Sequence, residues 1–185
     1  MSEDNKNSKP RISNKLKKEI DLSLAKVEAI IRHIKNVQDN CLLMGKRLIE
    51  SGQIDLGRML IARGLTHDNS KFFGAEWDNM SPVPIGPQQD PAKVKRNLSI
   101  YHHRESNDHH PEYWGNIKEM PQVAIAEMIC DWKARSEEFG NSLRDWIKDY
   151  AMKNWQFDEK DQIYKDIFRY VDMICEKPFE QITSD

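Results

Sequence analysis

Apolar residues recur every three to four positions along much of this chain, as they do on the buried face of an amphipathic helix. The first such stretch covers residues 13–39, and the spacing continues through residues 41–48. We therefore predict a helix over 13–39 that extends to about Ser51, where Gly52 favours a stop. The same spacing predicts a second helix over 54–66.

The middle of the chain breaks this pattern. Residues 80–91 contain four prolines and a glycine, so we predict a loop there. A short helix is expected around Glu76 and Trp77, and no segment shows the alternation of a strand. Further helices are predicted over 92–104, 121–140 with Pro121 as its first residue, 142–154, and 159–176 with Asp158 as its N-cap. The predicted fold class is all-α, a bundle of six or seven helices.

Length, charge, apolar segments and cysteines limit the classes of protein to which this chain can belong. The 185 residues suit one domain, predicted over 13–185 after a flexible polar tail over 1–12. The net charge of −2 argues against a strong, non-specific nucleic-acid binder. No apolar run reaches the length of a membrane span, and no apolar segment near the N-terminus resembles a secretory signal. Three widely spaced cysteines indicate free thiols in a reducing compartment, so a cytoplasmic location is expected.

The candidate functional residues are mainly histidines and aspartates. His33 falls on the buried stripe of the first helix, and the spacing of 92–104 predicts that His102 also points inward. Asp131 lies inside a predicted helix beside Trp132. A carboxylate near a core is costly unless a cation neutralises it. Imidazole and carboxylate together suit a divalent ion of Mn, Fe, Co, Ni, Zn or Mg, and the chain has no cluster of thiolates that would suggest a structural zinc site.

The order of these residues resembles the HD-domain superfamily of metal-dependent phosphohydrolases. That pattern has a histidine in one helix, a contiguous His-Asp after a later helix and a distant aspartate in a further helix. The segment HDNSK at 67–71 is similar to the H-D-x-G-K form of the HD-GYP branch, and HHRESNDHHPEYW at 102–114 to its HH-E-x-x-D segment. With EMICDW at 127–132, the longer pattern looks closest to an uncharacterised family of bacterial and phage proteins. The resemblance covers about 28–140 and implies an HD-domain-like bundle.

The resemblance also implies roles for individual residues. A first metal ion would be held by His33, His67, Asp68 and Asp131, with Asp68 bridging to a second ion. His102 and His109 are the expected ligands of that second ion. Their neighbours, His103 and His110, remain alternatives as ligands or as substrate-binding residues.

Four further charged residues are candidates near this site. Lys71 stands where single-metal members of the superfamily carry a catalytic glutamate, and a lysine suits a phosphate oxygen. We therefore count it as both a catalytic and a substrate-binding candidate, with an exposed surface lysine as the alternative. Glu76 is expected to act as an acid or base, or to orient a metal-bound histidine. Arg104 and Arg135 are candidates for binding an anionic substrate.

The expected function is hydrolysis of a nucleotide or a related small phosphoester by one or two divalent ions. Two alternatives stay open at this point. One is an HD-fold di-iron oxygenase, which a histidine-rich site would suit. The other is a non-catalytic module of the same fold that binds a nucleotide or a protein. The amphipathic C-terminal helices also leave a homodimer open.

Overall fold

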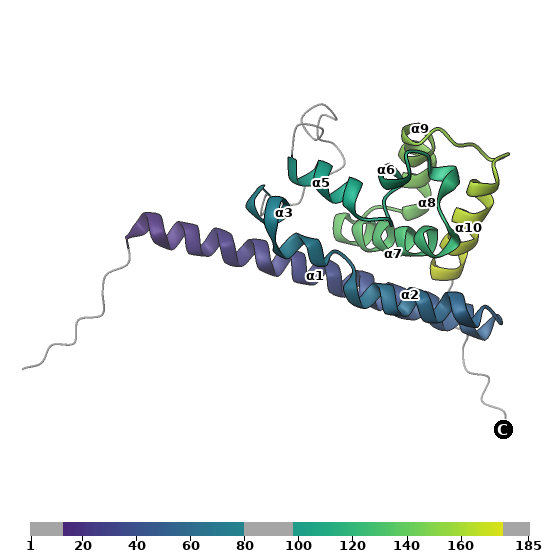
Figure 1. Ribbon diagram of the computed structural model, residues 1–185, viewed down its shortest axis with the longest axis horizontal. Helices are drawn as coiled ribbons and strands as arrows, with labels where there is room; N and C mark the ends of the chain where they lie inside the picture. The colour runs from purple at the N-terminus through teal and green to yellow at the C-terminus, as the bar shows by residue number, and fades with distance from the viewer. Residues whose placement is uncertain (1–12, 80–97, 176–185) are drawn as a thin grey trace, which may run out of the picture.

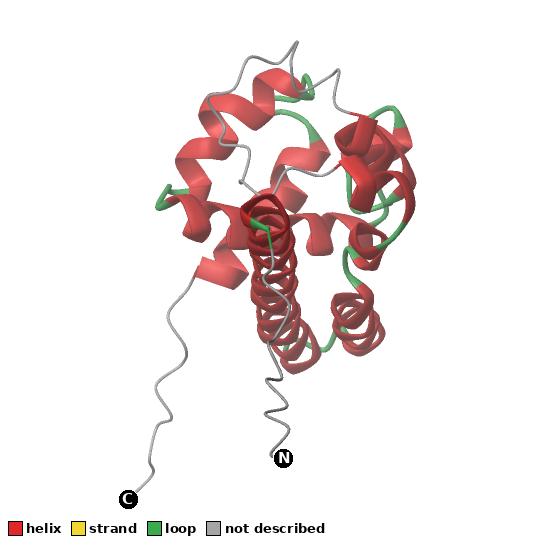
Figure 2. Cartoon of the chain, turned by 90° about the vertical axis from the view of Figure 1, so that its left-hand side faces the viewer, coloured by secondary structure: helices red, strands yellow, loops and turns green. Residues whose placement is uncertain are grey.

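The computed structural model describes residues 13–79 and 98–175. Over these two ranges the chain forms helices joined by turns and contains no strand (Figure 1, Figure 2). The all-α prediction is therefore confirmed. The predictions for the tail over 1–12, the loop over 80–91 and the first part of the helix over 92–104 lie outside the described residues.

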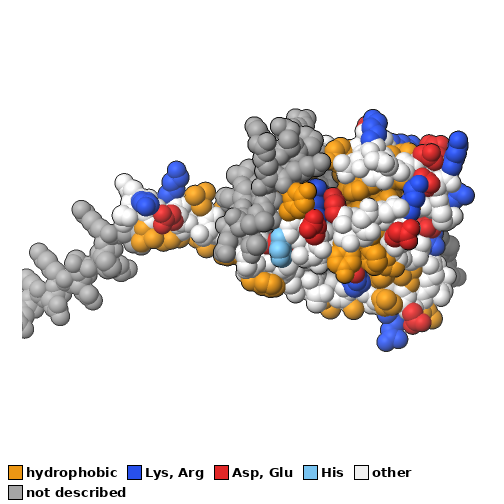
Figure 3. Space-filling view, turned by 45° about the horizontal axis from the view of Figure 1, so that its top comes forward, with side chains coloured by type: hydrophobic (Ala, Val, Ile, Leu, Met, Phe, Trp, Pro, Cys, Tyr) orange, Lys and Arg blue, Asp and Glu red, His pale blue; other side chains and the backbone are white. Residues whose placement is uncertain are grey.

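Helix α1, Asn14–Glu50, is the longest element. It begins after Ser13, whose side-chain oxygen accepts the Leu16 amide hydrogen at 3.2 Å, and it ends at Ser51, followed by Gly52 with φ +88°. The predicted continuation beyond residue 39 is confirmed. The first turns of α1 project from the rest of the molecule (Figure 1, Figure 3), and they expose apolar side chains such as Leu24. From Ile30 onward, one face of the helix is buried.

Helix α2, Ile54–Thr66, runs back along α1 at close range. A Cβ atom on Gly57 would lie 2.5 Å from the carbonyl oxygen of Gly45, so only glycine fits at this contact. A Cβ atom on Gly64 would similarly lie 2.6 Å from the Cβ atom of Cys41. Because the two backbones approach this closely, the C-terminal end of α2 is held against the middle of α1, beside His33.

Helix α7, Gln122–Phe139, lies across α1 and α2 and is buried on most sides. Pro121 is the residue before its first turn, one position earlier in the helix than predicted, and Gly140 closes it with φ 67°. Helix α10, Gln162–Cys175, packs against α7 and α1. The core between these elements includes Val37, Met44, Leu48, Leu60, Ile125, Met128, Ile129, Ile167 and Val171.

Shorter elements complete the fold. Those before α7 are η1 (Asn69–Phe72), α3 (Gly74–Asn79), α5 (Leu98–Ser106), α6 (Pro111–Trp114) and η2 (Ile117–Glu119). Those after it are α8 (Leu143–Trp146), a π-helical turn, η3 (Ile147–Ala151), and α9 (Met152–Asn154), which together occupy the helix predicted over 142–154.

The prediction for the last helix is wrong at its start. Helix α10 begins at Gln162 and not at 159, and Asp158 is not its N-cap. The Asp158 carboxylate instead accepts the backbone N–H of Lys160 at 2.8 Å, within a turn that precedes the helix. No helix within the described residues has the length and apolar character that crossing a membrane requires. Cys41, Cys130 and Cys175 are free thiols, as expected.

Candidate metal centre

Four segments bring the predicted ligands to one place between α1, α2 and α7. His33 projects from α1, His67 follows the last residue of α2, and Asp131 projects from α7. Asp68 has left-handed backbone angles, φ 57° and ψ 19°, which end the α2 direction and start η1. Aspartate tolerates this region better than most residues, and such angles are often found at functional sites.

The first ligand group consists of His33, His67, Asp68 and Asp131, all buried. The Nε2 atom of His33 lies 3.1 Å from Asp131 Oδ1 and 3.3 Å from Asp68 Oδ2. The Nε2 atom of His67 also lies 3.3 Å from Asp68 Oδ2. The structure therefore brings together the four residues that were predicted to hold a first ion.

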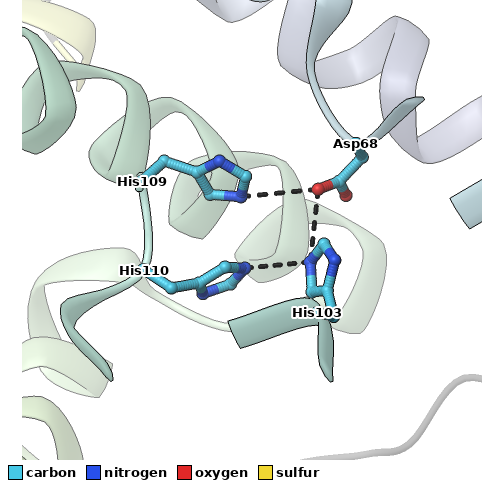
Figure 4. A group of neighbouring side chains, drawn as sticks. All are labelled: Asp68, His103, His109 and His110. Carbon is cyan, nitrogen blue, oxygen red and sulfur yellow. Dashed lines mark hydrogen bonds and ion pairs between the residues drawn. The ribbon is translucent and has the colours of Figure 1, made fainter. Parts of the chain in front are cut away.

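The second ligand group consists of Asp68, His103, His109 and His110 (Figure 4). The other oxygen of Asp68, Oδ1, lies 3.2 Å from His103 Nε2 and 3.4 Å from His109 Nε2. The Nε2 atom of His110 lies 2.9 Å from that of His103. Asp68 thus directs one oxygen toward each ligand group, which is the arrangement that a bridging carboxylate needs.

The structure does not place His102 in either group. Its side chain is 49% exposed, and its Nδ1 atom lies 3.2 Å from Glu76 Oε1. The prediction that His102 points inward is therefore wrong. Among the described side chains of α5, the buried ones are those of Ser99 and His103, which are polar and lie four residues apart. Of the neighbouring residues His102 and His103, His103 is the one whose ring faces Asp68.

Several buried atoms of both groups have no hydrogen-bond partner. They are the Nε2 atoms of His33, His67 and His109, together with Asp68 Oδ1 and Asp131 Oδ1. Leaving a buried polar atom unpaired costs about 1–3 kcal/mol, and more where the group is charged. Nitrogen and carboxylate oxygen atoms that converge in this way are also the donors that divalent transition ions prefer. The residues present therefore fit one or two such ions.

Carboxylates behind the histidines orient the rings. The Nδ1 atom of His33 lies 3.1 Å from Glu138 Oε1, that of His67 2.9 Å from Glu127 Oε1, and that of His103 2.9 Å from Glu76 Oε2. A ring that donates its Nδ1–H to a carboxylate leaves the Nε2 lone pair free for a metal ion. In all three rings, that Nε2 atom is the one that faces the centre.

Glu127 and Glu138 are site residues that were not predicted from the sequence. Both lie on α7, four residues before and seven residues after Asp131. Residues at these spacings share one face of a helix, so the position of Asp131 already contained this signal.

The charges of the site favour a cation. Burial would raise the pKa of Asp68, but the neighbouring His67, Lys71 and His103 hold it well below its usual range. Burial opposes ionisation of Asp131 as well, and His33 and His67 bring its pKa well below the usual value. Both aspartates are therefore carboxylates at neutral pH and offer negative charge to an ion.

The pKa values of two histidines are shifted in opposite directions. Burial would lower the pKa of His67, but Asp68 and Glu127 together raise it to about 10. Burial lowers the pKa of His110 well below 6.5, and the nearby His109 and His103 lower it further. His110 is therefore neutral with a lone pair available, whereas an ion entering the first ligand group has to displace a proton from His67.

The remaining predicted residues lie around the two groups. The Lys71 side chain is buried, with its ammonium against Asp68 Oδ2. Glu76 is fully buried behind His103, where it orients that ring and also contacts His102. Both of its expected roles, orienting a metal-bound histidine and acting as an acid or base, stay predictions.

The two arginines both contact carboxylates. Arg104 donates to Glu112 Oε1 at 3.1 Å, and Arg135 donates to Glu138 Oε2 at 2.9 Å. Arg135 therefore supports the carboxylate that orients His33. Each arginine side chain is 38% exposed, so neither is sealed inside the protein.

Residues 23–175 match the model of DUF5662, a family of unknown function. Because the match covers most of the chain, the protein belongs to this family. No curated protein and no solved structure matches the chain.

Proposed function

We propose that this DUF5662 member is a metal-dependent phosphohydrolase of the HD-domain type, acting on a nucleotide or a related small phosphoester. One observation supports the proposal most directly. Three buried histidines donate from Nδ1 to a carboxylate and turn Nε2 toward Asp68, whose two oxygens face two groups of ligands. Histidines packed for stability alone have no need of this shared orientation.

Each ligand group would hold one divalent ion. His33, His67, Asp68 and Asp131 offer two nitrogens and two carboxylates, which suits Mn, Fe, Co, Ni, Zn or Mg. Asp68, His103, His109 and His110 offer three nitrogens and one carboxylate, a set that disfavours Mg. Bound ions supply Lewis acidity toward a phosphoryl oxygen and lower the pKa of a bound water.

Lys71 has a specific part in this proposal. Its ammonium balances the charge of Asp68 in the metal-free protein. Ions on both sides of Asp68 would neutralise that carboxylate, and the ammonium would then be available to a phosphate oxygen. A lysine that contacts the phosphoryl group stabilises the charge that develops during transfer.

Metal content and hydrolysis test the proposal. Elemental analysis of protein purified without a histidine tag or chelator should find about two equivalents of Mn, Fe, Co, Ni or Zn, as a two-metal hydrolase requires. The His67→Ala, Asp68→Ala double variant should lose them. A matched control is Lys35→Ala, which removes only an exposed ion pair with Asp39 on the helix that carries His33.

Activity is then measured with the bound metal on p-nitrophenyl phosphate, bis(p-nitrophenyl) phosphate and the nucleoside mono-, di- and triphosphates. Hydrolysis of at least one compound by the parent and the Lys35→Ala protein, and by no preparation of the double variant, supports the proposal. Protein that carries its full metal complement and hydrolyses none of them contradicts it and favours a binding module.

The histidine-rich second ligand group favours one alternative, an HD-fold di-iron oxygenase. Three imidazoles around one position suit iron, and iron at such a site can react with dioxygen. An iron-loaded protein that consumes dioxygen and is inactive on phosphoesters would establish this alternative. Oxygen-electrode measurements on the same preparations separate the two activities.

A further inference from the structure

The three carboxylates behind the histidines do not divide evenly between the two ligand groups. Glu138 contacts His33, which belongs to the first group, and Glu76 contacts His103, which belongs to the second. One carboxylate oxygen of Glu127 contacts a histidine of each group. Its Oε1 atom lies 2.9 Å from Nδ1 of His67 in the first group and 3.5 Å from Nδ1 of His109 in the second.

Arg63 contacts the other carboxylate oxygen of Glu127. Its Nε donates to Glu127 Oε2 at 2.5 Å. Its Nη1 donates to Asp108 Oδ2 at 3.1 Å, and Nη2 contacts the second oxygen of the same carboxylate. Asp108 immediately precedes His109 in the chain, and Arg63 lies one helical turn before His67.

A single guanidinium therefore connects the C-terminal end of α2, the middle of α7 and the segment between α5 and α6. Those three places carry ligands of both groups. A guanidinium suits this task because it is planar and always charged, and because it can hold two carboxylates in fixed directions. The Arg63 side chain is 28% exposed and that of Glu127 only 3%, so the contact is largely shielded from water.

We infer that Arg63 is a positioning residue that supports both ion sites at once, acting through Glu127 and Asp108. This inference rests on the two-ion centre of the proposed function. Without Arg63, Glu127 would be a buried carboxylate that lacks the guanidinium holding its Oε2 atom. It would then shift relative to the rings of His67 and His109 together.

The expected effect is a loss of affinity at both sites. Removing a partner that orients a metal-ligating histidine typically lowers metal affinity roughly 10–100-fold. Arg63→Gln should therefore raise the dissociation constants of both ions by roughly 10–100-fold. Glu138→Gln should raise only that of the first group, and Glu76→Gln only that of the second.

The experiment is a calorimetric titration of chelator-treated full-length protein with Zn²⁺, repeated with Co²⁺ while its absorption bands are followed. His33→Ala and His110→Ala assign each binding step to a ligand group. Arg63→Gln is compared with Glu138→Gln and Glu76→Gln, which are matched controls because each alters one orienting carboxylate. Circular dichroism and the unfolding midpoint of each metal-free variant show whether it is folded.

Loss of affinity at both sites in folded Arg63→Gln, with single-site loss in each control, supports the inference. A change at one site only, or at neither, overturns it. If Arg63→Gln does not fold, Arg63→Lys decides, because a lysine can hold Glu127 or Asp108 but cannot span both. Weakening of both sites by roughly 3-fold or more in that variant supports the inference, and unchanged sites overturn it.

The outcomes also separate this inference from the proposed function. Protein that binds two ions, both of them more weakly in Arg63→Gln, but hydrolyses no phosphoester would refute the function and leave the role of Arg63 standing. Protein that hydrolyses phosphoesters while Arg63→Gln disturbs one site alone would refute only the role of Arg63. Protein that binds fewer than two ions refutes the inference.

Discussion

Divalent ions should raise the thermal unfolding midpoint of this protein strongly, because the ligands come from elements that are far apart in the sequence. His33 belongs to α1, Asp68 follows α2, His103 belongs to α5 and Asp131 to α7. An unfolded chain does not hold these side chains together. Ions therefore bind the folded state in preference, and each bound ion shifts the folding equilibrium toward it.

The size of the shift follows from this linkage. At a free ion concentration about 100 times the dissociation constant, each ion stabilises the folded state by about 2.7 kcal/mol, so two ions contribute about 5 kcal/mol. For a chain of this length, each kcal/mol raises the midpoint by about 2–4 °C, which gives a total of roughly 10–20 °C.

Differential scanning fluorimetry of chelator-treated protein, with Zn²⁺, Mn²⁺, Co²⁺ or Mg²⁺ added separately, measures this shift. The His67→Ala, Asp68→Ala variant should lose most of it, and Lys35→Ala should retain it. A shift below about 2 °C with every ion would refute the linkage argument, since it is less than one bound ion should give. An equal shift in the double variant would place the ions elsewhere on the protein.

Three further predictions concern packing, protons and charge. Gly57→Ala should destabilise the protein by about 1–3 kcal/mol in urea denaturation, because the added Cβ would meet the Gly45 carbonyl oxygen at 2.5 Å. Ion binding should release protons between pH 6 and 8, because the pKa of His67 is raised to about 10 in the metal-free site. Affinity should therefore increase with pH, by about tenfold per pH unit for each proton displaced, as calorimetry in buffers of different ionisation enthalpy can measure. Lys71→Met should lower kcat about 100-fold or more while ion affinity is kept or increased, since the ammonium that contacts Asp68 is removed. Parallel loss of ion affinity and kcat would contradict that role.

The sequence was sufficient for the parts of the fold that hydrophobic periodicity controls. The 3.6-residue spacing predicted the long first helix, the second helix and the helix that carries Asp131. It also placed His33 on a buried face, where the structure has it. The same spacing could not reveal the π-helical turn over 147–151, because a π turn changes the period locally without any marker residue.

The hydrophobic spacing led to the wrong choice between His102 and His103, and the reason is physical. The buried side chains on the described part of α5, those of Ser99 and His103, are polar, so a search for apolar spacing does not select them. The residues that orient the ligands were missed for a different reason. Glu127 lies 60 positions from His67, and Glu138 lies 105 positions from His33. The position of Asp131 marked the face of α7 on which both glutamates lie, but only the packing of α7 against α1 and α2 determines which histidine each one contacts.

Anomalous X-ray diffraction from crystals grown with Zn²⁺ or Mn²⁺ tests the two-ion centre most directly, because it counts the ions and locates them. We expect two anomalous peaks, one on either side of Asp68. One peak should contact His33, His67 and Asp131, and the other should contact His103, His109 and His110. Crystals without a peak at Asp68, in which the Nε2 atoms of these histidines bind water or protein oxygens, would show that the two-ion centre does not form.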